Sequence, residues 1–260
     1  ESDEEVLLSC HCCHPSLCND NLSGIALSSR LAEVLRGLSL RYSYRFLFIP
    51  GAIGSITWLS KNEEVASRIK HGLVVTGVGD SGTFHYKKSR RGDTEIDRVV
   101  QYVLKHSGKP YQVRDFSPYG YDERQYCSPG FNLPVGSLTR SPHGSYPQYH
   151  TSADDLNFVS TGALVESLSI YLEVIRVLEN NRRYQNLNPK CEVRLGRRGL
   201  YRTIGGEIGQ PLNEFALLWV LNLSDGSNSL LDISERSGLF FDDVESAAGA
   251  LLGKGLLKSV

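Results

Sequence analysis

Hydrophobic and polar residues follow two different rhythms along the first 181 residues, and each rhythm predicts a different element. Short apolar or alternating runs bounded by Gly, Pro or polar residues predict strands over residues 5–12, 41–49, 71–79, 111–116 and 133–139. Apolar residues three or four positions apart predict helices over residues 22–38, 94–108 and 160–181, and another through Trp58 and Leu59. Strands that alternate with helices are typical of an α/β fold, so we expect a mixed, largely parallel sheet flanked by helices.

The pattern changes after a polar, asparagine-rich segment at residues 180–192. Beyond it, apolar periodicity predicts helices over residues 214–223, 229–238 and 240–257, with a turn at Ser237–Gly238 between the last two. This order is typical of a helix-turn-helix, and residues 192–204 are a candidate β hairpin or arm. We therefore predict an α/β domain over residues 1–188 and a small winged helix-turn-helix domain over residues 189–260.

The composition is that of an ordinary globular protein, with 40% hydrophobic residues, 22% charged residues and a net charge of −1. This balance gives no general electrostatic attraction to nucleic acid or membranes. No apolar run is as long as the stretch of about 18 residues that a membrane-spanning helix needs. Four of the six cysteines lie between Cys10 and Cys18, which suits a reducing compartment and predicts a cytoplasmic protein. The lack of Met and the acidic start before a strand indicate a fragment whose N-terminal part is missing.

The stretch HCCHPSLCNDNLSG, residues 11–24, concentrates metal-binding side chains at the end of the first predicted strand. His14 and Asp20 lie six residues apart on this loop, close enough to converge on one zinc ion. The N-terminal end of the following helix favours an ionised Asp20. Three other interpretations stay open: a structural zinc site of cysteines and histidines, a redox pair of Cys10 and Cys13, or packed core cysteines without metal.

A later stretch, PHGSYPQYHTSADDL at residues 142–156, places two acidic residues shortly after a histidine. A metal-ligating histidine commonly donates its second ring N–H to a carboxylate. We expect Asp154 or Asp155 to support His150 in this way. A helix or turn cap formed by Asp154 is the alternative.

Asp122 and Glu123 are adjacent acids in a segment rich in Tyr, Gly and Pro, residues 117–131. In a loop, neighbouring side chains can point the same way, so one acid can serve a metal site while the other acts as a base. The alternative is a plain solvated charge cluster.

These motifs resemble those of the co-catalytic zinc aminopeptidases, the group that includes bacterial leucyl aminopeptidases and glutaminyl cyclases. The segments CHPSLCNDNLSG, YGYDERQYCSPGFNLPVGSL and PQYHTSADDL carry the resemblance, in this order along the chain. A closer resemblance, to uncharacterised aminopeptidase-like proteins with a C-terminal winged helix, spans nearly the whole chain. It implies that His14 is the first ligand, Asp20 the bridging ligand and His150 the ligand at the second metal position, with Tyr149 beside the substrate or its oxyanion.

The chain departs from the aminopeptidase pattern at two places. The aminopeptidases carry a Glu-Glu pair before a Gly-Ser turn, one as general base and one as ligand, whereas the matching PGAIGS segment has Gly51 and Ala52. Their later Asp ligand matches Thr76, and Asp80 follows four residues further on. We therefore expect one zinc ion, held by the three ligands named above, rather than two.

The function implied by the resemblance is zinc-dependent, aminopeptidase-like cleavage of an amide bond of a small amine-bearing molecule or peptide. Glu123 is the predicted general base, because it neighbours Asp122, which matches a supporting position of the family. Tyr149 or Arg124 is expected to stabilise the oxyanion. A non-catalytic, metal-binding member of the fold is the alternative, because the Glu-Glu pair is absent.

The C-terminal helix-turn-helix raises DNA binding as a third function. From Lys190 to Val260 there are eight Lys or Arg and nine Asp or Glu residues, and the second helix of the motif begins with Asp242, Asp243 and Glu245. These acids would repel phosphate, so we predict no nucleic-acid and no membrane partner. We expect this domain to serve packing or homo-oligomer formation instead.

Overall fold

The computed structural model describes residues 2–14, 16–200 and 213–260, and the chain divides into two compact units, Glu1–Arg176 and Val177–Val260. The domain boundary expected after residue 188 lies inside the second unit, because strand β7 (Arg183–Asn186) pairs with the other strands of that unit. Within the described ranges, no helix combines the length and the apolar character needed to cross a membrane.

The first unit is built on a six-stranded sheet with the order β2-β1-β3-β6-β4-β5. All neighbouring strands are parallel except β4 and β6, which confirms the mixed, largely parallel sheet. The sequence did not predict β4, because its four residues include a histidine and a lysine and show no clear alternation. The strands are β1 (Glu5–His11), β2 (Ser43–Ile49), β3 (Ile69–Val75), β4 (Phe84–Lys87), β5 (Tyr111–Arg114) and β6 (Val135–Thr139).

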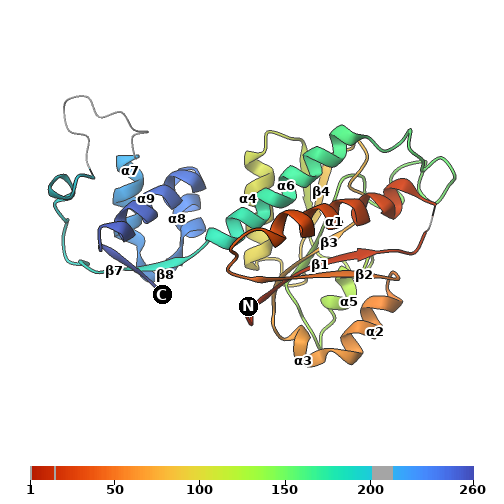
Figure 1. Ribbon diagram of the computed structural model, residues 1–260, viewed down its shortest axis with the longest axis horizontal. Helices are drawn as coiled ribbons and strands as arrows, with labels where there is room; N and C mark the ends of the chain where they lie inside the picture. Colours follow the sequence, from red (N-terminus) through yellow and green to blue (C-terminus); the bar gives the residue numbers. More distant parts are fainter. Residues whose placement is uncertain (1, 15, 201–212) are drawn as a thin grey trace. The chain divides into compact units, whose positions relative to one another are not determined.

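Helices cover both faces of this sheet, as Figure 1 shows. One face carries α1 (Ser23–Arg36), α4 (Glu95–His106) and α6 (Thr161–Asn180), and the other carries α2 (Ile53–Lys61), α3 (Glu63–Ala66) and α5 (Glu123–Tyr126). The long helices match the predicted ranges closely. The sequence did not predict α3 and α5, because a single helical turn is too short to show a period.

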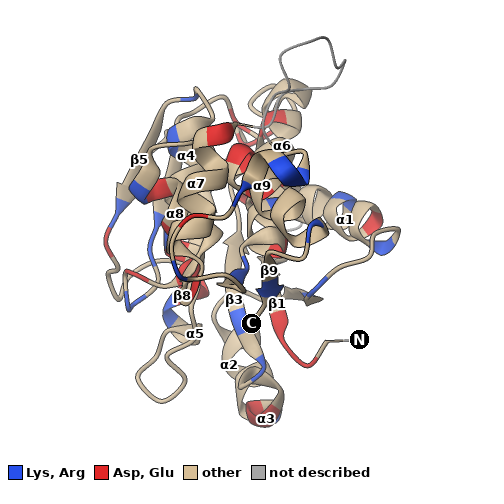
Figure 2. Cartoon of the chain, turned by 90° about the vertical axis from the view of Figure 1, so that its left-hand side faces the viewer, with Lys and Arg blue, Asp and Glu red and all other residues tan. Residues whose placement is uncertain are grey.

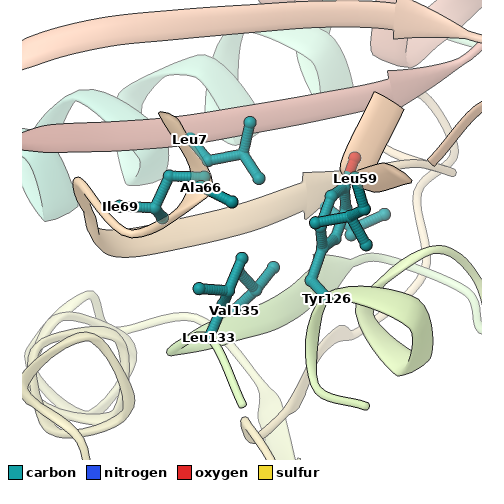
Figure 3. Close-up of a cluster of buried hydrophobic side chains, with 8 residues drawn as sticks. Leu7, Leu59, Ala66, Ile69, Tyr126, Leu133 and Val135 are labelled. Atoms are coloured by element: carbon teal, nitrogen blue, oxygen red, sulfur yellow. The ribbon is translucent and has the colours of Figure 1, made fainter. Parts of the chain in front are cut away.

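A buried apolar cluster fixes α2, α3 and α5 against the sheet (Figure 3). The side chains of Leu59, Ala66 and Tyr126 come from these three helices and pack on Leu7, Ile69, Val74, Leu133 and Val135. The phenol of Tyr126 also lies 2.8 Å from the hydroxyl of Ser9, so its polar end is satisfied inside the core. The packing of Tyr126 holds the short helix α5, and with it Asp122 and Glu123, in a defined place.

The second unit has a three-stranded antiparallel sheet with the order β8-β7-β9, formed by β7, β8 (Asp225–Ser229) and β9 (Leu257–Ser259). Its helices are α7 (Glu214–Leu223), α8 (Leu230–Ser237) and α9 (Phe241–Gly253). Gly238, with φ 74°, ends α8 in the left-handed region, which confirms the turn of the predicted helix-turn-helix.

The hairpin expected over residues 192–204 is not found in its described part. Residues Leu195–Arg198 form a short 3-10 helix, and residues 201–204 lie outside the described ranges. The sheet of this unit instead uses the polar segment before Lys190, whose strand β7 is too short and too polar to be recognised from its pattern.

Buried His71 gives the first unit a stability that depends on pH. Its side chain is 4% exposed and lies 3.3 Å from the phenol of Tyr42, and burial followed by the charge of Arg41 lowers its pKa from 6.5 to about 4. The unfolded chain therefore binds more protons than the folded chain between these two pH values. We expect the free energy of unfolding to fall by about 2 kcal/mol between pH 7 and pH 5.

Urea unfolding at both pH values measures this change, and His71→Gln is the matched variant. The variant should lose most of the pH dependence in this window. If the free energy of unfolding of His71→Gln changes with pH as steeply as that of the parent chain, other groups cause the pH dependence.

Candidate metal centre

The loop that leaves β1 carries the first two predicted ligands. β1 is buried along its whole length and ends at His11, so the chain emerges from the sheet at its carboxyl edge. The following turn, η1 (Cys18–Leu22), carries Asp20 and runs directly into α1. Strand ends that feed helices are the usual ligand positions of open α/β sheets.

The structure brings His14, Asp20 and His150 together. His14 Nδ1 lies 3.8 Å and His150 Nε2 lies 3.0 Å from Asp20 Oδ2, and the two imidazole rings are 4.5 Å apart. Asp20 is 1% exposed, yet within the described ranges its Oδ2 makes no hydrogen bond of acceptable geometry and the buried His14 Nδ1 has no hydrogen-bond partner. Buried polar atoms are almost always paired, so these converging, unpaired donors fit a metal ion.

His11 is a member of this group that sequence analysis did not include among the ligands. Its Nε2 lies 2.8 Å from Asp20 Oδ1, its ring stacks on Tyr121 at 5.2 Å, and its side chain is 3% exposed. Donor atoms of His11, His14 and Asp20 all lie within 4.8 Å of one another. His11 can therefore act as a further metal ligand or as the hydrogen-bond donor that orients Asp20. The sequence feature that could have identified it is its position as the last residue of a buried strand.

The three histidines keep Asp20 ionised. Burial works against ionisation of this carboxyl, but the hydrogen bond with His11 and the charges of His11, His14 and His150 outweigh it and lower the pKa of Asp20.

Asp154 binds the backbone of the loop that carries Asp20, and it does not bind the ring of His150. Its two carboxylate oxygens accept hydrogen bonds from the backbone N–H groups of Asn19, at 2.6 Å, and Asp20, at 3.0 Å. The expectation that Asp154 holds the His150 ring is therefore wrong. The reason is that both oxygens of this carboxylate already accept hydrogen bonds from backbone N–H groups of the turn. Asp155 instead binds the backbone and side chain of Asn157.

The carboxylate of Asp80 is hydrogen-bonded to neighbouring groups, so Asp80 does not replace the missing aspartate ligand. Its carboxylate accepts from the hydroxyl of Ser141 at 2.6 Å, from Gly82 N at 2.7 Å and from the side-chain amide of Asn19 at 2.9 Å. Thr76, at the position of that ligand, is fully buried and offers a hydroxyl instead of a carboxylate.

Asp122 holds the turn in which the aminopeptidases carry their glutamates. Its Oδ1 accepts from Ala52 N at 2.6 Å and from the hydroxyl of Ser55 at 2.8 Å, and it therefore fixes the start of α2. Ala52 has φ 56°, a strained left-handed conformation that such a bond helps to maintain. The supporting role of Asp122 stays a prediction, and the residue precedes a helix instead of lying in an open loop.

Glu123 is fully buried and paired with a cation. Its Oε1 lies 2.7 Å from Lys87 Nζ, which also donates to the carbonyl oxygen of Tyr119, whereas Oε2 has no hydrogen-bond partner in the part of the chain that the structure describes. The solvated charge cluster considered from the sequence is thus wrong for this residue. Because Oε1 is engaged by Lys87, Oε2 is the oxygen with capacity for a proton.

His143 lies in the same region and was not a candidate from the sequence. Its ring contacts Tyr121 at 4.9 Å and Tyr119 at 5.4 Å. Burial lowers its pKa, while the charges of Glu123 and Asp20 act in the opposite direction. The only sequence signal was its position seven residues before His150 in a loop already assigned to the site.

Tyr149 lies beside His150, whereas Arg124 is not joined to the histidines in the described part of the chain. The Tyr149 ring stacks on His150 at 3.9 Å and contacts Tyr146 at 5.6 Å. Arg124 follows Glu123 on α5, and its buried Nε has no hydrogen-bond partner in residues 2–14, 16–200 and 213–260. Among the described residues, no hydrogen bond, ion pair or ring contact links it to the histidines.

The cysteines of the opening stretch do not form one cluster, and all six cysteines of the chain are free. Cys10 is buried and accepts a hydrogen bond from the Asn21 amide at 3.2 Å, as a packed core thiol does. Cys12 and Cys13 are exposed, and Cys13 Sγ accepts from Gly51 N at 2.7 Å. The donor group given above holds no sulfur, which favours the histidine and aspartate site over a cysteine site.

Comparison with known proteins places the chain in a family. Residues 1–181 match the model described as a domain of unknown function, DUF4910, and residues 182–259 match a winged helix-turn-helix model. The chain belongs to the DUF4910 family. This member is 56% identical, over all of its 260 residues, to a protein of Clostridium acetobutylicum described as a candidate polysaccharide biosynthesis protein with an aminopeptidase-like domain. It spans 60% of the length of that relative.

Solved structures confirm the resemblance to the zinc aminopeptidase fold. A candidate peptidase from Clostridium acetobutylicum matches with a TM-score of 0.91 and 54% identity, covering 99% of this chain and 58% of that one. A zinc aminopeptidase from Bacillus subtilis matches with a TM-score of 0.57 and 15% identity, covering 68% of this chain and 47% of that one. At the lower identity the likeness is one of fold, so the chemistry must be argued from the residues of this chain.

Proposed function

We propose that this DUF4910 protein is a zinc-dependent hydrolase that cleaves an amide bond of a small acylated amine. The observation that carries the proposal is the convergence of His14 Nδ1 and His150 Nε2 on the buried, unpaired Asp20 Oδ2. Two imidazoles and one carboxylate are a common ligand set of catalytic zinc, and they leave a position for a reactant. The aminopeptidase-like fold supports the same assignment.

One zinc ion is favoured over two. The glutamate ligand of the aminopeptidases corresponds to Gly51 or Ala52, and their later aspartate corresponds to Thr76. Asp80, the nearest alternative acid, is fully hydrogen-bonded elsewhere. These substitutions remove two of the ligands with which the aminopeptidases hold their second ion, and His11 is the remaining additional donor.

In this mechanism, each remaining residue has one task. Zinc, when bound, polarises the amide carbonyl and acidifies a water molecule. Glu123 takes up the proton of the attacking water on Oε2, while Lys87 orients the carboxylate through Oε1. The Tyr149 phenol donates a hydrogen bond to the carbonyl oxygen, and Arg124 is the second candidate for that task.

His143 is a second candidate for the base. Its half-buried ring lies between Tyr119 and Tyr121, close enough to Asp20 and Glu123 for their charges to act on it. Unlike Glu123, it forms no ion pair among the described residues.

Metal analysis tests the site directly. The purified chain, reloaded with zinc after removal of chelators, should bind about one zinc ion per chain. His14→Ala combined with His150→Ala should abolish binding, because two of three ligands are lost. Cys12→Ser combined with Cys13→Ser is the matched control and should keep the zinc. Retention of zinc by the histidine variant, or its loss from the cysteine variant, would point to a different site.

Turnover separates the two candidate bases. Glu123→Gln should keep zinc and the Lys87 contact but lower the rate on acyl-amine substrates about 10²–10⁴-fold, the usual cost of losing a general base. Glu33→Gln, which removes an exposed ion-paired carboxylate on α1, is the control and should retain full activity. If Glu123→Gln stays active while His143→Gln does not, His143 is the base.

No turnover by the parent chain on any aminoacyl amide or acylated amine would favour a non-catalytic, metal-binding role.

We further propose that the winged-helix unit does not bind DNA. Asp242 and Asp243 lie in the first turn of α9, the helix that follows the turn of the motif. Figure 2 shows Lys and Arg interspersed with Asp and Glu, and the described helices α7, α8 and α9 are not covered by basic residues. A role in packing or self-association, in a cytoplasmic protein, fits this surface better.

A gel-shift assay at low salt checks this. The chain should leave a DNA duplex unshifted up to about 1 µM protein, below the range of typical non-specific binding. A salt-sensitive shift at lower concentrations would overturn the proposal and favour a DNA-binding regulator.

A further inference from the structure

The second unit contains a cleft that shares no residue with the metal centre. Its volume is about 440 Å³, within the range of small-molecule sites. It is lined by β7, by the segment that follows β7, and by the end of α7 with the start of β8. All of the described lining residues belong to Val177–Val260, so the cleft lies within one unit.

Asn186 holds the walls of this cleft together. Its backbone N–H donates to the carbonyl oxygen of Ser224 at 2.7 Å, and its side-chain amide donates to that of Leu221 at 2.8 Å. Its Oδ1 accepts a hydrogen bond from the backbone N–H of Asn188, also at 2.8 Å. These bonds join β7 to the end of α7 and to the following segment. A ligand therefore meets a site that is already formed.

The charges around the cleft favour a cation over an anion. The C-terminal end of a helix carries partial negative charge, and the last turn of α7, which lines the cleft through Leu221 and Asn222, has no basic residue. Asp225 follows this turn and adds a full charge, because hydrogen bonds from the hydroxyl and the backbone N–H of Ser227 lower its pKa to about 2. Among the described residues that line the cleft, none is Lys, Arg or His.

The same cleft offers apolar surface and a hydroxyl group. Leu218 and Leu221 of α7 line it, and the side chain of Leu218 is 37% exposed. Ser224 also lines it and is 2% exposed, and its hydroxyl has no hydrogen-bond partner in the described part of the chain. Buried hydroxyl groups are normally paired, so a ligand that combines carbon atoms with an N–H group suits these walls.

From this cleft we infer that the winged-helix unit binds a small organic amine in its protonated form. The ammonium group pairs with Asp225 and the carbonyl end of α7, and the carbon chain packs on Leu218. Binding needs neither zinc nor turnover, so the inference goes beyond the proposed hydrolase function. Cleavage of an acylated amine would release a molecule of this class.

Three probes of similar size and different charge test the ligand class. At pH 7 isopentylamine is a cation, isopentanol is neutral and isovalerate is an anion. In saturation-transfer NMR titrations of the 260-residue chain, the amine should bind with a Kd of about 1–10 mM, the alcohol more weakly and the acid not detectably. Asp225→Asn should weaken binding of the amine about 2- to 5-fold, the range for one exposed ion pair. Asp242→Asn is the control and should leave it unchanged, because it removes an exposed carboxylate of α9 that does not line the cleft.

Alkylation of Cys191 shows whether the amine lies in the cleft. This free thiol is exposed and lines the cleft, whereas Cys12 and Cys13 are exposed thiols of the first unit. Isopentylamine well above its Kd should slow the reaction of Cys191 with iodoacetamide several-fold, measured by peptide mass spectrometry, and leave Cys12 and Cys13 unaffected. The protection should persist when His14→Ala and His150→Ala remove the proposed zinc ligands.

The outcomes separate this inference from the proposed function. Equal binding of the three probes, or no binding of the amine, overturns the inference even if the chain is a zinc hydrolase. Protection of Cys13 without protection of Cys191 would place the amine near the metal loop and also overturn it. Protection of Cys191 in a chain that binds no zinc would uphold the cleft and remove the hydrolase instead. A loss of binding in Asp242→Asn as large as that in Asp225→Asn would count against the role of Asp225.

Discussion

The arrangement of the metal centre depends on the burial of one carboxylate, that of Asp20. An ionised carboxylate is stable away from water only when donors or cations surround it. His11 occupies one of its oxygens, and His14 and His150 approach the other from two separate loops. Asp154 fixes the backbone on which Asp20 stands. Asp20 can thus stay ionised in its buried position only while these side chains keep their places.

The convergence of His14, Asp20 and His150 could be predicted from the sequence, because these residues are recognisable by type and by position. His14 and Asp20 follow a buried strand within one short loop, and His150 lies in a second loop with a matching motif. The roles of Asp154 and Glu123 could not be predicted in the same way. Asp154 binds backbone N–H groups more than 130 residues away, and Glu123 binds Lys87 on β4, 36 residues away. Pairs of this kind leave no periodicity or spacing in the chain.

Among the helices and strands, the long ones could be predicted from the sequence and the short ones could not. Helices α1, α4 and α6 were predictable because several turns repeat the apolar spacing, as were strands with a continuous apolar run such as β1. The four-residue elements β4, α3 and α5 were not, because packing against neighbours decides their conformation. Strand β7 was missed since its polar residues read as a linker.

The hydrogen bond between Gly51 N and Cys13 Sγ bears on how this site can change by substitution. A Cβ atom built on Gly51 would lie 2.8 Å from that sulfur, closer than real Cβ contacts allow. A glutamate at position 51 would therefore have to displace the Cys13 side chain. The two positions are coupled, because an acid at position 51 would turn the exposed Cys13 thiol away from the backbone and remove its hydrogen bond with the N–H group of residue 51.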